Sequence, residues 1–180
     1  DSGGGVEAVQ TVVRRAAERG HHVRVLGTEG LRSRFESAGA EFRRYRYAPD
    51  NDSRSTQTDI VKEWEARTTL GVFARVRDRV MFGPAREFCR DITEELHRAA
   101  ADVVVVDTLI PSALSAAEAA GVPSVLLMHG PYLLPRPGVP PIGTGFLPAR
   151  GGPGRLRDRA LGAVTPVSYT HLRAHETGRN

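Results

Sequence analysis

The sequence predicts an α/β fold in which helices pack on a parallel β-sheet, and two stretches carry this prediction. The first is Ala101 to His129, ADVVVVDTLIPSALSAAEAAGVPSVLLMH, whose pattern is strand, helix, strand. Its valine run, Val103–Val106, is typical of a strand buried on both faces. The second stretch is residues 6–47, where amphipathic helices alternate with strands. Such alternation predicts right-handed crossovers between parallel strands, and hence a Rossmann-like sheet.

The elements of the N-terminal stretch are predicted from their periodicity. A helix over Val6–Arg19 has apolar residues at helical spacing and ends at Gly20, and a strand over His22–Gly27 follows it. A second helix is expected over Glu29–Ala38. The aromatic residues of Glu41–Tyr47 then favour a second strand.

Two longer helices are predicted between this stretch and the central one. The polar residues 49–58 indicate a loop before them. The helices are expected over Asp59–Arg79 and Pro84–Ala100, because both have apolar residues at helical spacing. Trp64 and Phe73 on the first of them are expected in the core.

Proline and glycine mark the boundaries of the remaining elements. Pro111 suits the start of a helix, where its missing N–H is not needed, and Gly121 suits the helix end. A second buried strand is predicted over Ser124–Met128. The Pro- and Gly-rich residues Gly130–Gly154 then predict a long loop, and Arg155–Gly162 a last helix.

The first residues of the chain bear on both fold and site. Residues 1–5, DSGGG, are predicted to form a loop that leads directly into the first helix. In a crossover unit such a loop follows a strand, so the first strand of the sheet is expected to be missing. Ligands of open α/β sheets bind at the carboxyl ends of the strands. Asp107 and His129 lie at two of these ends, so chemistry is expected there.

Composition excludes several other classes of protein. The chain has 180 residues, enough for one α/β domain, and a formal net charge of +4. Its arginines are scattered among acidic residues along the helices, and Lys62 is the only lysine, which argues against nucleic-acid binding. No apolar run approaches the roughly 20 residues of a membrane helix. The single cysteine, Cys89, excludes an internal disulfide, which fits a cytoplasmic location. We expect its thiol to be packed and inert.

Three stretches together resemble a known family: residues 1–27, residues 82–107 and residues 116–129. They are similar to the N-terminal half of GT-B glycosyltransferases, of the bacterial UDP-glycosyltransferase-like kind that modifies macrolides and other natural products. The resemblance implies transfer of a sugar from a nucleotide donor to a hydroxyl of a small-molecule acceptor, with this half binding the acceptor. It also implies that a C-terminal domain, absent from this chain, holds the nucleotide sugar. That sugar is a co-substrate, and no cofactor or metal is expected.

The resemblance also assigns candidate site residues. Many family members use a His after the first strand as general base, and that position falls on Gly5 in this sequence. Asp107 matches the Asp that supports this base, so we expect that either Asp107 or His129 takes the base role or that the mechanism differs. Asp107 is therefore the predicted catalytic residue. The predicted acceptor-binding residues are Gly3, Gly4, Gly5, His129 and Tyr132.

Two other functions remain open from the residues alone. Gly3, Gly5 and Ala8 satisfy the pattern G-x-G-x-x-A, and Glu29 follows the next predicted strand. These are elements of a dinucleotide-binding fingerprint, so an NAD(P)-dependent Rossmann oxidoreductase is one alternative. A non-catalytic ligand-binding α/β module is the other.

The C-terminal residues form a separate case. Residues 167–177, VSYTHLRAHET, resemble the in-frame translation of a transposase-type adapter used in short-read DNA libraries. We therefore predict an acceptor-binding domain over residues 1–163, truncated at both ends, and a non-native or disordered tail over residues 164–180. His171 and His175 lie four residues apart, as in metal-binding helices, but without a third ligand they are assigned no metal.

Overall fold

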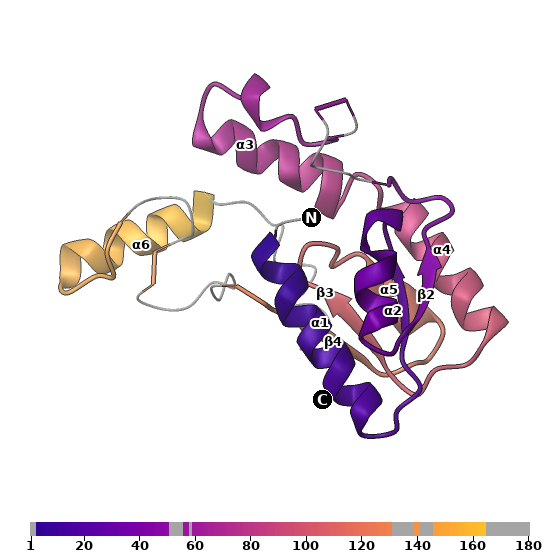
Figure 1. Cartoon of the computed structure of the whole chain (residues 1–180). Helices are drawn as coiled ribbons and strands as arrows, with labels where there is room; N and C mark the ends of the chain where they lie inside the picture. Colours follow the sequence, from indigo (N-terminus) through magenta and orange to yellow (C-terminus); the bar gives the residue numbers. More distant parts are fainter. Residues whose placement is uncertain (1–2, 51–55, 58, 131–138, 141–145, 165–180) are drawn as a thin grey trace. The chain divides into compact units, whose positions relative to one another are not determined.

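The computed structural model describes residues 3–50, 56–57, 59–130, 139–140 and 146–164. The chain forms two compact units, residues 1–130 and residues 131–180. All four strands described here lie in the first unit (Figure 1). The second unit contains α6, Gly152–Val164, where the sequence predicted a helix over Arg155–Gly162. Residues 167–177 lie outside the described part, so the proposed tail and the 1–163 domain remain predictions.

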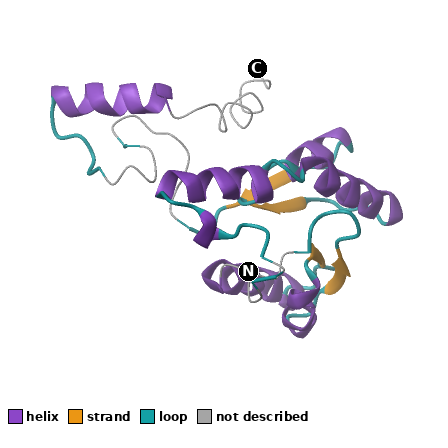
Figure 2. Ribbon diagram, turned by 90° about the horizontal axis from the view of Figure 1, so that it is seen from above, coloured by secondary structure: helices purple, strands orange, loops and turns teal. Residues whose placement is uncertain are grey.

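The strands form two parallel pairs, which confirms the α/β class. In the first pair, β1 (Arg24–Gly27) runs parallel to β2 (Glu41–Arg44). In the second pair, β3 (Val104–Asp107) runs parallel to β4 (Ser124–Leu127). Figure 2 shows the two orange pairs apart from each other, and no described strand joins β1 to β3. The architecture is a partial Rossmann-like sheet with flanking helices.

Helices cover the two faces of these strand pairs. Residue periodicity placed each helix of the strand–helix–strand units correctly, with boundaries that differ by a few residues. Both strand–helix–strand segments have the short connections that a right-handed crossover favours. The helices of the first unit are α1 (Gly3–Glu18), α2 (Arg32–Ser37), α3 (Thr69–Val76), α4 (Ala85–Arg98) and α5 (Ala113–Ala119).

Two apolar clusters hold these layers together. The first joins α1 and α2 to β1 and β2 through Val13, Phe35, Ala38, Ala40 and Phe42. The second joins α4 and α5 to β3 through Ile92, Val106, Ala113 and Ala116. Leu26 of β1 packs against the second cluster, whereas its neighbour Val25 packs against the first. In β1 these two neighbours therefore pack on opposite helical layers.

In β3 and β4 the predicted burial on both faces is wrong: Val106 is 3% exposed, but Val103 is 49%, Val105 53% and Val125 53% exposed. The described helices α4 and α5 cover the face of β3 that carries Val106.

The predicted helix over Asp59–Arg79 is the main error in element boundaries. The structure instead has a 3₁₀ turn at Glu63–Glu65, then α3 and a π-helical turn at Arg77–Met81. Lys62 is left-handed, with φ 49°, and Thr68 is extended, so the helical pattern is interrupted at both positions. The Thr68 hydroxyl then caps α3 by accepting the Gly71 N–H at 3.1 Å.

Trp64 and Phe73, which sequence reasoning placed in the core, are exposed. Trp64 is 57% exposed and Phe73 is 43% exposed. Helical spacing alone predicted their burial, and the interruption of the helix removes the continuous face on which that prediction depended.

Strand β2 also ends earlier than predicted, at Arg44 rather than Tyr47. Beyond the strand, the backbone N–H groups of residues 46–48 all turn toward one buried carboxylate, that of Asp91 on α4. The distances from these nitrogens to the carboxylate oxygens are between 2.8 and 3.2 Å. Hydrogen bonds to Asp91 therefore replace the sheet ladder here, and they hold the segment after β2 against α4.

Candidate functional site

Asp107 and His129 meet at the carboxyl ends of two paired strands. Asp107 is the last residue of β3, and His129 lies two residues after β4. His129 Nε2 is 3.1 Å from Asp107 Oδ2 and 3.3 Å from Oδ1. The His129 side chain is only 12% exposed and that of Asp107 34%. An imidazole held by a carboxylate can accept a proton from a substrate hydroxyl, because the carboxylate fixes the tautomer and stabilises the imidazolium.

The Asp107 carboxylate is itself held by the backbone that follows β3. Its Oδ1 accepts the Leu109 N–H at 2.8 Å. This local turn fixes the side-chain rotamer and points the carboxylate across to His129. With Nε2 donating to Asp107, the remaining ring nitrogen of His129, Nδ1, is the acceptor of the ring.

Gly5 lies directly against the imidazole of His129. A Cβ atom at position 5 would lie 2.5 Å from His129 Cε1 and 2.7 Å from Nδ1. Such distances are below van der Waals contact, so no side chain fits there while the ring keeps its place. At the position where the family resemblance expected a His, the chain has a glycine, and the His129 ring occupies that space.

The other predicted acceptor-binding residues have different outcomes. Gly3, Gly4 and Gly5 form the first turn of α1 rather than a loop, because the helix begins at Gly3 and not at Val6. This first turn contains no acidic residue. Tyr132 lies outside the described residues.

Sequence reasoning missed Tyr45, which lies near the Asp107–His129 pair. Its ring packs edge-on against Phe88, with ring centroids 5.3 Å apart. Burial raises the pKa of the Tyr45 phenol, and the negative charges of Asp107 and Asp91 raise it further. The phenol therefore stays neutral. Sequence reasoning missed Tyr45 because the aromatic residues of the segment 42–47 indicated a strand and gave no sign of a functional role.

An open cavity of about 890 Å³ reaches the Asp107–His129 pair. Its lining includes Gly5 and Leu109, which contact the pair. It is also lined by β1, β3 and residues of α1 and α4. The end of the cavity at the strand termini contains the Asp107–His129 pair, so a reaction site is sought there.

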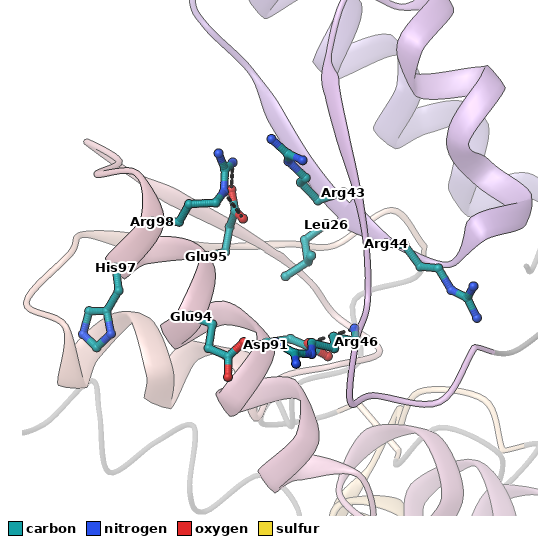
Figure 3. A pocket seen from close by; sticks show the side chains of 9 residues that line it. All are labelled: Leu26, Arg43, Arg44, Arg46, Asp91, Glu94, Glu95, His97 and Arg98. Atoms are coloured by element: carbon teal, nitrogen blue, oxygen red, sulfur yellow. Dashed lines mark hydrogen bonds and ion pairs between the residues drawn. The ribbon is translucent and has the colours of Figure 1, made fainter.

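A second hollow, drawn in Figure 3, contains four arginines but does not form an anion site. Glu95 accepts from Arg98 at 2.6 Å (Figure 3). Arg46 lies 3.6 Å from the carboxylate of Glu94, and Arg44 lies 3.1 Å from that of Asp50. Glu41 accepts from both Arg43 and Arg98. These groups neutralise one another, which agrees with the interpretation of the arginines as paired surface residues.

The dinucleotide fingerprint is not favoured by the geometry. The ring of His129 occupies the space next to Gly5, where the fingerprint needs an open approach to the backbone. Glu29, the proposed ribose ligand, forms two hydrogen bonds to Arg32, at 2.6 and 2.9 Å.

The described residues contain neither a metal centre nor a membrane-spanning helix. No group of three or more His, Cys, Asp or Glu residues in the described part is arranged to hold a metal ion. Among the described helices, none has the length and apolar character needed to cross a membrane.

Comparison with known proteins gives one informative similarity. No protein-family model matches the chain. The chain is 28% identical over 173 residues to 4'-demethylrebeccamycin synthase of Lentzea aerocolonigenes. This match covers 96% of the chain and 41% of that protein, so the chain spans less than half of its relative. The similarity supports the resemblance of the chain to the N-terminal portion of a glycosyltransferase.

Proposed function

We propose that this chain is the acceptor-binding part of a glycosyltransferase that acts on a small natural product, with His129 as general base and Asp107 as its orienting carboxylate. The observation that carries the proposal is the 3.1 Å contact between His129 Nε2 and Asp107 at the ends of β3 and β4. The similarity to 4'-demethylrebeccamycin synthase supports it independently of this geometry.

The proposed chemistry follows from the orientation of the imidazole. Nδ1 of His129 accepts the proton of an acceptor hydroxyl as its oxygen forms a bond to the anomeric carbon of the donor sugar. The bond from that carbon to the nucleoside diphosphate breaks, and the leaving group takes its electron pair. The proton remains on His129, where the Asp107 carboxylate stabilises the positive charge. The nucleotide sugar would be held mainly by a domain outside this chain.

The test is sugar transfer by the complete enzyme that contains this chain. His129→Gln and Asp107→Asn should each lower kcat/KM by about 10²- to 10⁴-fold, the usual contribution of a positioned general base.

Matched controls separate catalysis from structure. Asp102→Asn alters an exposed carboxylate two residues before the start of β3, at the end of the strand far from Asp107. His97→Gln alters an exposed His on α4. Both should keep the wild-type rate. Unchanged transfer by Asp107→Asn or His129→Gln, with folding intact, would remove that residue from the mechanism.

A further inference from the structure

We propose that the Tyr45 hydroxyl is a specificity-determining group of the candidate site, where it donates a hydrogen bond to a neutral oxygen of the acceptor, such as a ring carbonyl. This inference rests on the proposed function, because it gives a second contact to the acceptor whose reacting hydroxyl meets His129. Tyr45 lines the same cavity as Asp107 and His129. None of the described residues forms a hydrogen bond with its hydroxyl, which leaves this donor open to a ligand.

Tyr45 lies at the end of a strand, as Asp107 and His129 do. It directly follows β2, and its backbone N–H donates to the Gly27 carbonyl at 3.0 Å, which extends the pairing with β1 by one residue. The negative charge of Asp107 acts on the phenol, so the two side chains lie within electrostatic reach of each other. Tyr45 thus joins the Asp107–His129 pair at the end of the cavity where the acceptor is proposed to bind.

The ring of Tyr45 is held in place before any ligand binds. It packs edge-on against Phe88, with an angle of 76° between the two ring planes. The backbone after it is fixed as well, because the carboxylate of Asp91 accepts the N–H groups of residues 46–48. A hydroxyl on such a fixed ring loses little conformational freedom when it binds, so it can discriminate between acceptors by one hydrogen bond.

The surroundings of the phenol define the group that it binds. Burial raises the pKa of Tyr45, and the charges of Asp107 and Asp91 raise it further, so the phenol keeps its proton and acts as a donor. The same two charges disfavour an anionic partner, which leaves a neutral oxygen. Phe88 and Val80 line the cavity together with Tyr45. An apolar, aromatic frame around the oxygen therefore fits this part of the cavity.

The experiment compares two aromatic alcohols that differ in one carbonyl group. They are hydroxyfluorenone and hydroxyfluorene, with the hydroxyl at the same ring carbon. Isothermal titration calorimetry measures the binding of each to residues 1–180. We expect the unsubstituted chain to bind hydroxyfluorenone about five- to tenfold more tightly, the usual net contribution of one hydrogen bond. Tyr45→Phe should bind both compounds with about the affinity that the unsubstituted chain has for hydroxyfluorene.

Tyr47→Phe is the matched control. The Tyr47 hydroxyl already donates to Glu94 Oε1 at 2.8 Å, and Tyr47 is not among the described residues that line the cavity. Its removal should leave the ratio of the two affinities unchanged. Urea unfolding separates binding from structure, because Tyr45→Phe keeps the ring and removes a hydroxyl that no described residue contacts. Its unfolding midpoint should equal that of the unsubstituted chain.

Sugar transfer by the complete enzyme gives a second measurement. Tyr45→Phe should raise KM for hydroxyfluorenone by about five- to tenfold and leave kcat unchanged, because the bond forms equally in the ground state and the transition state. His129→Gln should instead lower kcat. If the enzyme transfers no sugar to either compound, the proposed function fails, and the binding measurement still decides the role of Tyr45.

Four outcomes would overturn the proposal. The first is equal binding of the two compounds by the unsubstituted chain, and the second is a preference for the ketone that persists in Tyr45→Phe. The third is binding of neither compound at millimolar concentration. The fourth is a lower urea midpoint for Tyr45→Phe, which would show that the hydroxyl has a partner within the protein.

Discussion

At the scale of single residues, the site has a glycine at position 5, where a histidine was expected, and the ring of His129 fills the space beside it. The resemblance assigned a base to position 5, and the sequence offers only Gly5 there. In space the same volume is filled by His129, which comes from the end of a different strand. A proton acceptor can thus reach the Asp107 carboxylate from a second backbone position, provided that position 5 has no side chain.

The contact between Gly5 and His129 gives a prediction that needs only the stability of the chain. Gly5→Ala should destabilise the fold by about 1–3 kcal/mol, because its Cβ overlaps the His129 ring and forces a rearrangement. In a His129→Ala background the overlap is gone. There the same substitution should stabilise the chain by up to about 1 kcal/mol, the helix preference of Ala over Gly.

Urea unfolding of the four proteins in this double-mutant cycle measures the coupling. Equal effects of Gly5→Ala in both backgrounds would contradict the close contact.

Cys89 gives a second prediction at this scale. Its thiol donates to the Ser112 carbonyl at 3.3 Å, and burial raises its pKa. Because only the thiolate is alkylated, Cys89 should react with iodoacetamide more slowly than free N-acetylcysteine at pH 8. The difference should narrow as the pH rises through the raised pKa, and disappear when the chain is unfolded in urea. Labelling as fast as that of the free thiol in the folded chain would show that the thiol is not protected.

At the scale of elements, a buried carboxylate connects α4 to the segment after β2. Asp91 is 5% exposed and accepts N–H groups from residues 46–48. Asp91→Ala should cost about 2–4 kcal/mol of unfolding free energy, because several N–H groups lose a charged acceptor. Asp91→Asn, which keeps one acceptor oxygen, should cost less. Asp102→Ala, at an exposed position, serves as the control in urea titrations, and a loss there as large as that for Asp91→Ala would contradict the assignment.

Two adjacent valines of β3 test which faces of the strand are covered. Val106 is 3% exposed and packs against α4 and α5, whereas Val105 is 53% exposed. Val106→Thr should destabilise the chain by about 1–3 kcal/mol, since its hydroxyl is buried without a partner. Val105→Thr should change stability by no more than about 0.5 kcal/mol. Thermal unfolding of both variants is the measurement, and similar losses would mean that Val105 is also packed in solution.

The accuracy of sequence-based prediction also differs between kinds of element. Periodicity located the parallel pairs and placed Asp107 and His129 at strand ends, because strand ends depend on local pattern. It failed at Asp59–Arg79, where Lys62 and Thr68 interrupt a helix whose apolar spacing continues past them. Asp91 had a signal that was not used: it lies between Phe88 and Ile92 on the apolar stripe of α4, where a carboxylate needs a specific partner. That its partners are three backbone N–H groups depends on tertiary structure alone.

At the scale of the whole molecule, the two-sheet arrangement limits what residues 1–180 can do alone. In the proposed function, the Asp107–His129 pair supplies a base for an acceptor. The arginines of the hollow in Figure 3 are paired with carboxylates, so this hollow does not offer a site for a nucleoside diphosphate. Binding such a donor needs clustered hydrogen-bond donors or positive charges that are not already paired.

We therefore expect the isolated chain to transfer no sugar from a nucleotide sugar, whereas the longer enzyme that contains it does. The reason is chemical: a base can activate the acceptor hydroxyl, but without a bound donor there is no anomeric carbon within reach of the oxygen. The measurement is product formation by purified residues 1–180 with a panel of nucleotide sugars and a polyhydroxylated aromatic acceptor. The longer enzyme serves as the positive control, and its Asp107→Asn variant as the negative one. Turnover by residues 1–180 would place the donor site within this chain and would contradict the division of labour proposed for the two halves.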